Sequence, residues 1–184
     1  GLLLDAFNTY AFVGGMPEIV GEYARTAEVP SLARIYQSLF LSFQDDVEKY
    51  APGRTTAQVI RHAIQSVPFE AGKRIRFHGF GNSNYGSREM GEALRTLEKA
   101  MLLKLIYPTT QTRLPLAPNQ KRAPRLQFLD TGLMCYSVGL QGRLFEPMEI
   151  ESVYNGVLAE HVVGQELLAG SQTGSAPVFW VREK

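Results

Sequence analysis

The clearest hydrophobic pattern is a stripe of apolar residues that starts after Pro30 and stops at the Pro52-Gly53 pair. Its members are three or four positions apart, a spacing that places side chains on one face of an α-helix. The pattern therefore predicts a helix over residues 30–50 with one face buried. The stripe consists of Leu32, Ile35, Tyr36, Leu39, Phe40, Phe43, Val47 and Tyr50.

Three further helices are predicted around this one. An apolar stretch over residues 2–13 ends at a pair of glycines, and a first-turn proline opens a shorter helix over residues 17–25. Apolar residues at helical spacing predict another helix over residues 55–66, for which Thr55 or Thr56 can serve as the N-cap. The N-terminal third is therefore expected to be helical.

The middle of the chain changes to mixed spacing. Residues 75–77 alternate like a short strand, and the glycine- and asparagine-rich residues 79–86 predict a tight turn with one helical turn inside it. Two alternating segments, residues 103–107 and 125–129, predict a β-hairpin with a long loop. Helix, short strand, helical turn, helix and hairpin is the element order of a winged helix-turn-helix.

The helix that precedes the hairpin is predicted over residues 87–102. Ser87 stands where a side-chain N-cap is favoured. Leu94, Leu97 and Met101 fall on one face, which we expect to pack against the preceding helix. The opposite face then projects away from the core with its charged residues.

The C-terminal part holds fewer elements. A short helix follows Asp130, a longer helix is predicted over residues 149–168, and residues 178–181 alternate like a strand. No partner for that strand is evident, so we expect it and the long helix to begin a further domain. Gly1 resembles a cloning remnant and the chain opens within a helix, so the sequence is expected to be part of a longer protein.

Charge is distributed unevenly along the chain. The formal net charge of all 184 residues is only +1. Between residues 73 and 129 there are eleven basic residues and three acidic ones, a net charge of about +8, which leaves about −7 for the remainder. About a third of the chain is therefore strongly basic. Its basic residues are Lys73, Arg74, Arg76, Arg88, Arg95, Lys99, Lys104, Arg113, Lys121, Arg122 and Arg125.

Cysteine and histidine are too sparse to predict a metal site. Cys135 is the single cysteine, which excludes an intrachain disulfide and favours a reducing compartment, and the three histidines are scattered. We expect Cys135 to be a small buried hydrophobic residue. No apolar run reaches the roughly 18 residues of a membrane span, and no signal-peptide pattern is present. A cytoplasmic protein without a membrane partner is the expectation.

The basic segment is a candidate surface for DNA, because Lys and Arg supply most contacts to phosphate. Part of it lies on the outer face of the helix over residues 87–102, and part lies in the hairpin loop. The alternative is a solvated basic face that contacts another protein. Acidic residues on the same helix argue against base-specific reading, so DNA binding is expected to be nonspecific. The proposed contact residues are Ser87, Arg88, Arg95, Lys99, Arg113, Lys121 and Arg122.

Two acidic positions have more than one interpretation. Asp130 precedes Thr131 and Gly132 in a pattern that can look catalytic, but the same pattern is an ordinary N-cap, which we favour. The Asp45-Asp46 pair is expected on a solvated helix face or at a contact with another domain.

Five short motifs are spread over nearly the whole chain. In their order and spacing they resemble the C-terminal region, a domain of unknown function, in a large bacterial family of AAA+ ATPases. The motifs are Gly14-Gly15-Met16-Pro17, Asp46-Val47-Glu48-Lys49-Tyr50, the segment from Ala93 to Leu103, Phe128-Leu129-Asp130-Thr131-Gly132-Leu133, and the segment from Leu158 to Leu167.

This resemblance implies a domain order and a set of partners. In such proteins an ATPase core comes first, a winged helix follows, and a fold like that of restriction endonucleases closes the chain. ATP and a divalent cation are then expected as cofactors of the parent protein, with none in this part. The missing ATPase core and the remainder of the C-terminal domain are the expected partners within the same chain.

The active centres that the resemblance implies are incomplete here. No G-x-x-x-x-G-K-[ST] loop is present, because the glycines around Gly79 lack the lysine and the preceding strand. Of the acidic residues that hold a divalent ion in a nuclease-like fold, only Glu160 matches, and Arg182-Glu183-Lys184 lacks the residue between Glu and Lys. Glu160 is therefore either a ligand in the intact protein or a surface residue. No enzymatic activity is expected of this chain alone.

Together these observations predict a mainly α fold of the α+β class. Residues 1–53 are expected to form a helical connector after the ATPase core, and residues 54–140 a winged helix-turn-helix with a β-hairpin wing. Residues 141–184 are expected to be the truncated start of an α/β nuclease-like domain. The leading function is DNA binding as an accessory region of an ATPase; the alternative is an interaction or regulatory module that couples the ATPase to a partner.

Overall fold

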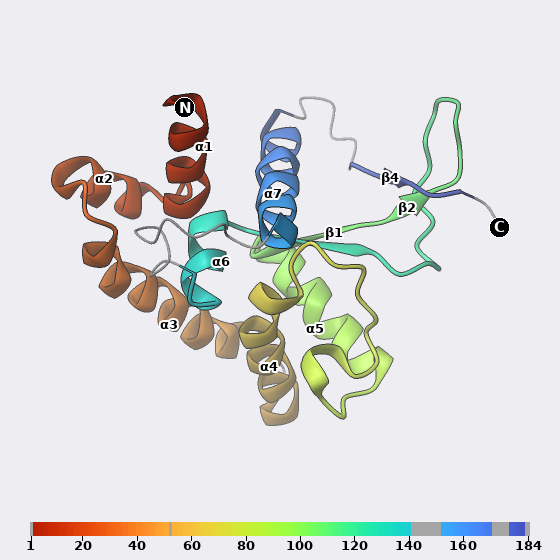
Figure 1. Ribbon diagram of the computed structural model, residues 1–184. Coiled ribbons are helices and arrows are strands. Elements are labelled where there is room, and N and C mark those ends of the chain that lie inside the picture. Colours follow the sequence, from red (N-terminus) through yellow and green to blue (C-terminus); the bar gives the residue numbers. More distant parts are fainter. Residues whose placement is uncertain (1, 52, 141–151, 171–176, 183–184) are drawn as a thin grey trace.

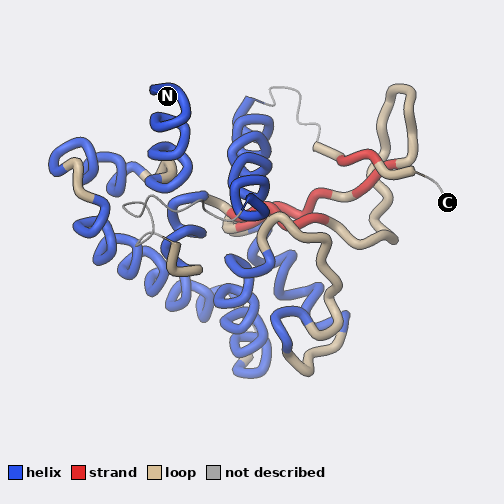
Figure 2. The backbone as a smooth tube through the Cα atoms, viewed as in Figure 1, coloured by secondary structure: helices blue, strands red, loops and turns tan. Residues whose placement is uncertain are grey.

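The computed structural model describes residues 2–51, 53–140, 152–170 and 177–182. Within them the protein is mainly helical, with seven α-helices, two short 3₁₀ helices and four short strands, which confirms the α+β class. Figure 1 shows α1, α2 and α3 on one side of the molecule, α4 and α5 below the β-hairpin and α7 above it. Figure 2 shows the strands as a narrow band that crosses the molecule between these helices.

The N-terminal helices have nearly the predicted bounds. The long helix differs only in its first turn, which is 3₁₀ rather than α. Leu32 and Tyr36 of the predicted stripe are fully buried and anchor the helix on the core, whereas its other described members are partly buried; the side chains of Val47 and Tyr50 lie outside the described residues. The elements are α1 (Leu2–Val13), α2 (Pro17–Thr26), η1 (Val29–Leu32) and α3 (Ala33–Tyr50).

Helix α4 (Arg54–Glu70) is longer than predicted at its C-terminal end. Val67 and Pro68 in the last turn are buried, and their packing compensates for the backbone hydrogen bond that a proline inside a helix removes. The N-cap residue is Gly53, and no side chain caps the helix. The predicted cap at Thr55 or Thr56 is therefore wrong.

Helix α5 (Ser87–Lys99) begins at the predicted residue, but Ser87 is not its cap. The N-cap is Gly86, whose backbone N–H donates to Oε2 of Glu89 at 3.0 Å. A glutamate at the third helical position reaches back to the N-terminal amide in this way in a capping box. The side chain of Ser87 is exposed instead.

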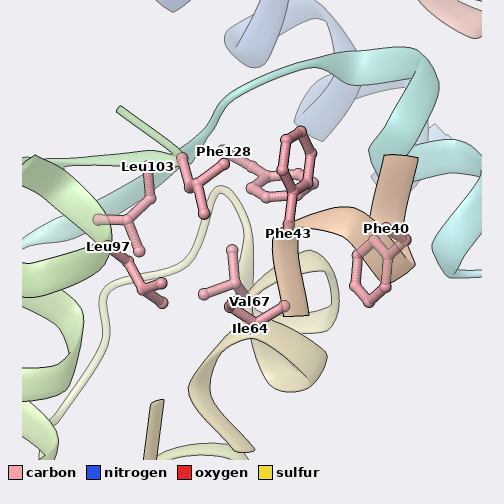
Figure 3. Close-up of a pocket in the computed structure, with 8 residues that line it drawn as sticks. Phe40, Phe43, Ile64, Val67, Leu97, Leu103 and Phe128 are labelled. Carbon is pink, nitrogen blue, oxygen red and sulfur yellow. The ribbon is translucent and has the colours of Figure 1, made fainter. Parts of the chain in front are cut away.

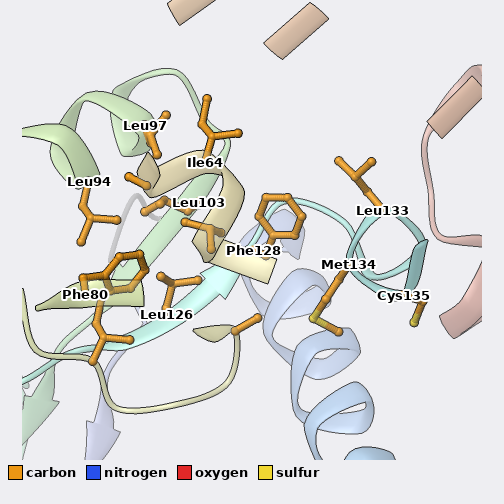
Figure 4. Packing of buried hydrophobic residues seen from close by; sticks show 14 of the residues in the cluster. Ile64, Phe80, Leu94, Leu97, Leu103, Leu126, Phe128, Leu133, Met134 and Cys135 are labelled. Carbon is orange, nitrogen blue, oxygen red and sulfur yellow. The ribbon is translucent and has the colours of Figure 1, made fainter. Parts of the chain in front are cut away.

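The C-terminal end of α5 also differs from the prediction. The helix stops at Lys99, and Met101, which helical spacing places in the core, has a φ of 60° and is 78% exposed. The left-handed backbone at Met101 redirects the chain into the first strand. Leu94 and Leu97 are buried as predicted, with Leu97 beside Ile64 of α4 (Figure 4).

The predicted hairpin is formed. Strand β1 (Leu103–Ile106) pairs in antiparallel fashion with β3 (Arg125–Phe128). Residues Leu103, Leu105, Leu126 and Phe128 point into the core, whereas Gln127 on the other face is buried beneath α7 and donates to the carbonyl oxygen of His161 at 2.8 Å. The apolar positions of the alternating pattern thus form one core face, and α7 covers part of the opposite face.

The strand predicted over residues 75–77 is not formed, and the segment just before it occupies the outer edge of β3. Arg74 forms an isolated antiparallel bridge with Arg125. The backbone N–H of Gly72 donates to the carbonyl oxygen of Leu126 at 2.8 Å, which extends this pairing. β-type pairing therefore falls earlier in the chain than the alternating pattern indicates.

The C-terminal strand has a partner, contrary to the prediction. β4 (Phe179–Trp180) pairs in parallel with β2 (Pro108–Thr109), a two-residue strand in the long hairpin loop. Helix α6 (Thr131–Ser137) follows the hairpin. Helix α7 (Ser152–Gly170) packs on β3 and contacts α1 and α6; the predicted first residues of this helix, 149–151, lie outside the described residues.

Within the described residues, a cluster of buried apolar residues joins helices α1 to α7 to the hairpin. Figure 4 shows the part of this cluster that lies between α4, α5, α6 and the hairpin. A cavity of about 10 Å³ lies where α3, α4, α5 and the hairpin meet (Figure 3). This is room for no more than one water, and the apolar walls offer it no hydrogen bond, so the cavity is a packing gap. The lining residues are Phe40, Phe43, Ile64, Val67, Leu97, Leu102, Leu103 and Phe128.

Candidate nucleic-acid interface

The outer face of α5 carries the charged residues that the sequence places there. Arg88, Glu92, Arg95 and Lys99 are all exposed, because the apolar positions of the helix hold its other face in the core. Three of these four side chains are cationic. The face is therefore basic along its length, with one acidic residue inside it.

Glu92 neutralises only the N-terminal part of this face. Its Oε1 lies 3.3 Å from Nε of Arg88, and both side chains are largely exposed. An exposed pair of this kind contributes little stability, so Arg88 can exchange Glu92 for another anion at low cost. In the part of the chain that the structure describes, Arg95 and Lys99 have no carboxylate within ion-pair distance.

The long loop between β1 and β3, residues 107–124, carries the second group of basic residues. Arg113, Lys121 and Arg122 are exposed, as is every residue from 111 to 122. Among the described residues, no carboxylate pairs with any of the three. Their charges are therefore open to solvent.

Asn119 gives the loop a defined shape near two of these residues. Its backbone N–H donates to the carbonyl oxygen of Pro108 at 2.8 Å, which ties together the two arms of the loop. Its Oδ1 accepts the N–H of Lys121 at 3.1 Å, and its carbonyl oxygen accepts the N–H of Arg122 at 3.1 Å. A turn thus fixes the backbone that presents Lys121 and Arg122.

Tyr107 lies at the base of the loop, directly after β1. Burial raises the pKa of its hydroxyl, the charge of Glu98 adds to this effect, and the charge of Arg95 opposes it. Arg95 is therefore within electrostatic reach of the loop base. Figure 1 shows α5 below the hairpin and the loop rising beyond the far end of the hairpin, both away from α1 to α3. The hairpin connects the two groups, which do not merge into one patch.

The remaining basic residues of this segment are largely engaged within the protein. Nζ of Lys73 lies 3.6 Å from Oε2 of Glu70, and Nζ of Lys104 lies 3.0 Å from Oε1 of Glu98. Arg125 pairs with Glu160 of α7. These contacts occupy Lys73, Lys104 and Arg125, whereas Arg76 is exposed outside both α5 and the hairpin loop.

Glu160, the one residue that matches a metal ligand by resemblance, is an ion-pair partner in this structure. Its carboxylate contacts the guanidinium of Arg125, and half of its side chain is exposed. The described residues contain no group of three or more His, Cys, Asp or Glu that could hold a metal ion. The contact with Arg125 gives Glu160 a structural role on its own.

His161 and Phe179 are contact residues that the sequence analysis does not identify. Nε2 of His161 accepts the backbone N–H of Phe128 at 3.0 Å, at the edge of β3 beyond the Gly72 pairing. The ring is fully buried, and burial lowers its pKa to about 4, so the imidazole is neutral and can accept this bond. His161 thus completes the strand edge and docks α7 on it.

Phe179 lies against two arginines. Its ring centroid is 5.5 Å from Cζ of Arg74 and 5.2 Å from Cζ of Arg125. These distances are within the range of cation–π contacts. An aromatic residue in a short strand gives no indication of such partners, because Arg74 and Arg125 are remote in sequence.

Two predictions for residues outside this surface, Asp130 and Cys135, are confirmed. Asp130 is the N-cap of α6, with Oδ1 accepting the N–H of Leu133 at 2.8 Å, which confirms the cap. Cys135 is buried as predicted, and burial raises the pKa of its thiol to about 12, so the thiol stays protonated. His62 is half-buried and bonds to the carbonyl oxygen of Phe80 at 3.0 Å.

A family model described as "Domain of unknown function (DUF8612)" matches residues 4–144. The match covers most of the chain, and the protein belongs to this family. Comparisons with curated proteins and with solved structures found no match. None of the described helices is long and apolar enough to cross a membrane.

Proposed function

We infer that the protein binds DNA through the outer face of α5 and the hairpin loop. The observation that carries this proposal is the set of exposed cationic side chains on these two elements, of which, among the described residues, only Arg88 has a carboxylate partner. Phosphate oxygens are the complementary ligand for such groups. The residues that we assign to the contact are Arg88, Arg95, Lys99, Arg113, Lys121 and Arg122.

The proposed fold of this region is a winged helix, with α5 as the recognition helix and the hairpin as the wing. Its support is the order of the elements: α4, the bridged segment at Arg74, the 3₁₀ turn η2 (Phe80–Asn82), α5 and the hairpin. Gly81 makes the turn possible, because its φ is +61° and a Cβ there would collide with Ser66 of α4. The turn therefore sits directly on α4, as the middle helix of such a domain does.

Binding through this surface would be largely independent of base sequence. Arg and Lys side chains on a loop contact the phosphate backbone wherever it runs, whereas base readout needs side chains that fit one edge pattern. The acidic residues Glu89 and Glu92 lie at the N-terminal end of α5, where base-reading residues of a recognition helix are placed. Their charge disfavours close entry into the groove.

The parent protein that we propose is an AAA+ ATPase of the family that the sequence motifs resemble. ATP and a divalent cation would act in its core, and this chain would supply the DNA contact. Residues 141–184 would belong to a nuclease-like domain, with Glu160 as a ligand in the intact protein. In that case Glu160 would have to exchange Arg125 for the metal ion.

The test is fluorescence anisotropy of a labelled duplex of about 20 base pairs titrated with the 184-residue chain at several salt concentrations. We expect affinity to fall as salt rises, with a slope of about −0.9 for each phosphate contacted. Two duplexes of unrelated sequence should give the same curve. Absence of binding at about 50 mM salt would remove the proposal.

The second candidate is a protein-interaction module, and one surface favours it. Leu41 of α3 and Phe69 of α4 are both more than half exposed and line a hollow of about 350 Å³ together with Tyr136. Exposed apolar side chains around a hollow are typical of a contact with another protein. If Leu41→Ser and Phe69→Ser abolish binding of the ATPase core while DNA affinity is unchanged, this surface serves the second function.

A further inference from the structure

We propose that strand β4 positions the hairpin loop for DNA binding, with Phe179 and Val181 as the positioning residues. The proposal rests on the proposed function, because the loop supplies part of the DNA contact. It adds a role for the C-terminal segment, which the basic residues alone do not indicate.

The loop needs such a support because the hairpin ends before it. The β1–β3 pairing stops at Ile106 and Arg125, and residues 111–122 are all exposed. The bonds formed by Asn119 are internal to the loop. They shape the loop, but they do not fix the direction in which it leaves the sheet.

Strand β4 supplies that fixed direction. The backbone N–H of Phe179 donates to the carbonyl oxygen of Tyr107 at 3.4 Å, and the N–H of Val181 donates to that of Thr109 at 2.9 Å. Thr109 is only 2% exposed although the loop beyond it is open to solvent. The first arm of the loop is therefore held as an inner strand, between β4 on one side and Asn119 on the other.

β4 is in turn attached to the rest of the protein by Phe179. The ring lies against Arg74 and Arg125, which bridge each other on adjacent backbone segments, so it rests on the sheet itself. Arg125 also pairs with Glu160 of α7. A continuous set of contacts thus runs from α7 through the sheet and β4 to the loop.

The consequence for binding is a lower ordering cost. A loop held in one direction loses little conformational freedom when it meets DNA, whereas a free loop loses that freedom at the moment of binding. Release of β4 should therefore weaken affinity without removing a cation. The salt slope, which counts phosphate contacts, should stay nearly constant.

The experiment compares Val181→Pro with Trp180→Pro in the 184-residue chain. The first change removes the N–H that bonds to Thr109, and the second removes an N–H that the parallel register directs away from β2. We expect Val181→Pro to lower duplex affinity roughly 5- to 20-fold at an unchanged salt slope, and Trp180→Pro to have less than about a twofold effect. Phe179→Ala should resemble Val181→Pro, and Phe179→Tyr should retain parental affinity.

A second measurement separates positioning from a general loss of structure. In a background with Arg113→Gln, Lys121→Gln and Arg122→Gln, Val181→Pro should have no further effect on affinity, because the loop no longer contributes. The role of β4 would be overturned if Val181→Pro lowered DNA affinity as much in that background as in the parent. It would also be overturned if Val181→Pro left the affinity of the parent unchanged or raised it. Neither outcome would contradict DNA binding itself. If the unmodified chain shows no salt-dependent binding, the proposed function and the role of β4 are both wrong.

Discussion

Asp130 accepts the backbone N–H of Gly15 at 2.7 Å, across 115 positions of sequence. The same carboxylate caps α6 through the N–H of Leu133. A Cβ at Gly14, where φ is +69°, would collide with it. The turn after α1 and the start of α6 therefore share one buried acidic side chain.

Replacement of Asp130 tests this junction. Asp130→Ala removes the acceptor of two backbone N–H groups in a buried site, and we expect it to lower the free energy of unfolding by roughly 2–4 kcal/mol. Asp130→Asn retains one acceptor oxygen and should lose less. Urea unfolding followed by circular dichroism measures both, and equal losses in the two variants would contradict the shared cap.

Leu97 lies in α5 and Met101 lies just after its end, so the two positions allow a direct comparison of a buried and an exposed side chain. Leu97 is 2% exposed, whereas Met101 is largely in solvent. Leu97→Ala should lower the free energy of unfolding by roughly 2–5 kcal/mol, as truncation of a buried leucine does. Met101→Ala should change it by less than about 0.5 kcal/mol. A large loss for Met101→Ala would place that side chain in the core.

The neutral state of His161 predicts a pH dependence of stability. The folded pKa of His161, about 4, lies below the ordinary histidine pKa of 6.5, so the unfolded chain binds the proton more tightly. The contribution of neutral His161 to the free energy of unfolding is therefore complete above about pH 6.5. This contribution, up to roughly 3 kcal/mol, is lost as pH falls toward 4. His161→Gln, which keeps an acceptor but does not titrate there, should reduce this acid-induced loss.

Titration of Asp130 changes the free energy of unfolding in the opposite direction as pH falls. The quantity to compare is therefore the difference in this free energy between the parent and His161→Gln at each pH. Burial raises the pKa of Asp130, and the N–H groups of Gly15 and Leu133 partly oppose this shift. Its contribution is the same in the parent and in His161→Gln and cancels. If the free energy of unfolding changes between pH 7 and pH 5 by the same amount in the parent and in His161→Gln, His161 is not the titrating group.

The basic surface is tested by removal of three charges. Arg95→Gln, Lys121→Gln and Arg122→Gln together should weaken binding to any duplex about equally and reduce the salt slope by up to roughly three. A control with Arg25→Gln, Arg34→Gln and Arg54→Gln loses the same charge from exposed positions on α2, α3 and α4. Equal effects of the two triple variants would show a nonspecific charge effect and no defined surface.

Nucleotide binding gives a further prediction. Because the chain lacks a phosphate-binding loop with its lysine, we expect neither tight ATP binding nor turnover above a buffer control. Equilibrium dialysis with labelled ATP and a phosphate-release assay are the measurements. Turnover that survives repurification would contradict the absence of an ATPase site in this chain.

The sequence predicts the bounds of elements well where capping or helix-ending residues lie next to them. It predicts them poorly where a contact between remote segments sets the bounds. Helix α1 ends at Val13 because two glycines follow, and Asp130 caps α6 because its partner is three residues away. Met101 fits the helical spacing, yet the chain must turn there to enter β1. The pairing of β4 with β2 and the bond from Phe128 to His161 join remote segments, and periodicity holds no information about them.

The candidate site divides in the same way. Exposure of Arg95 and Lys99 follows from the apolar face of α5, so the sequence is sufficient to predict it. Neutralisation of Lys104 by Glu98 and of Arg125 by Glu160 depends on how strands and helices meet. Net charge along the sequence therefore overstates the basic surface that is available to a ligand.

The junction at Asp130 also bears on how the protein is made. During synthesis α1 leaves the ribosome long before Asp130. The backbone N–H of Gly15 therefore lacks its acceptor until α4, α5 and the hairpin have been translated. Val13 has the same delay, since its carbonyl oxygen packs against Gly132. The end of α1 therefore lacks these late partners until the start of α6 has been translated, and nascent chains that end before Asp130 should be the ones that recruit chaperones.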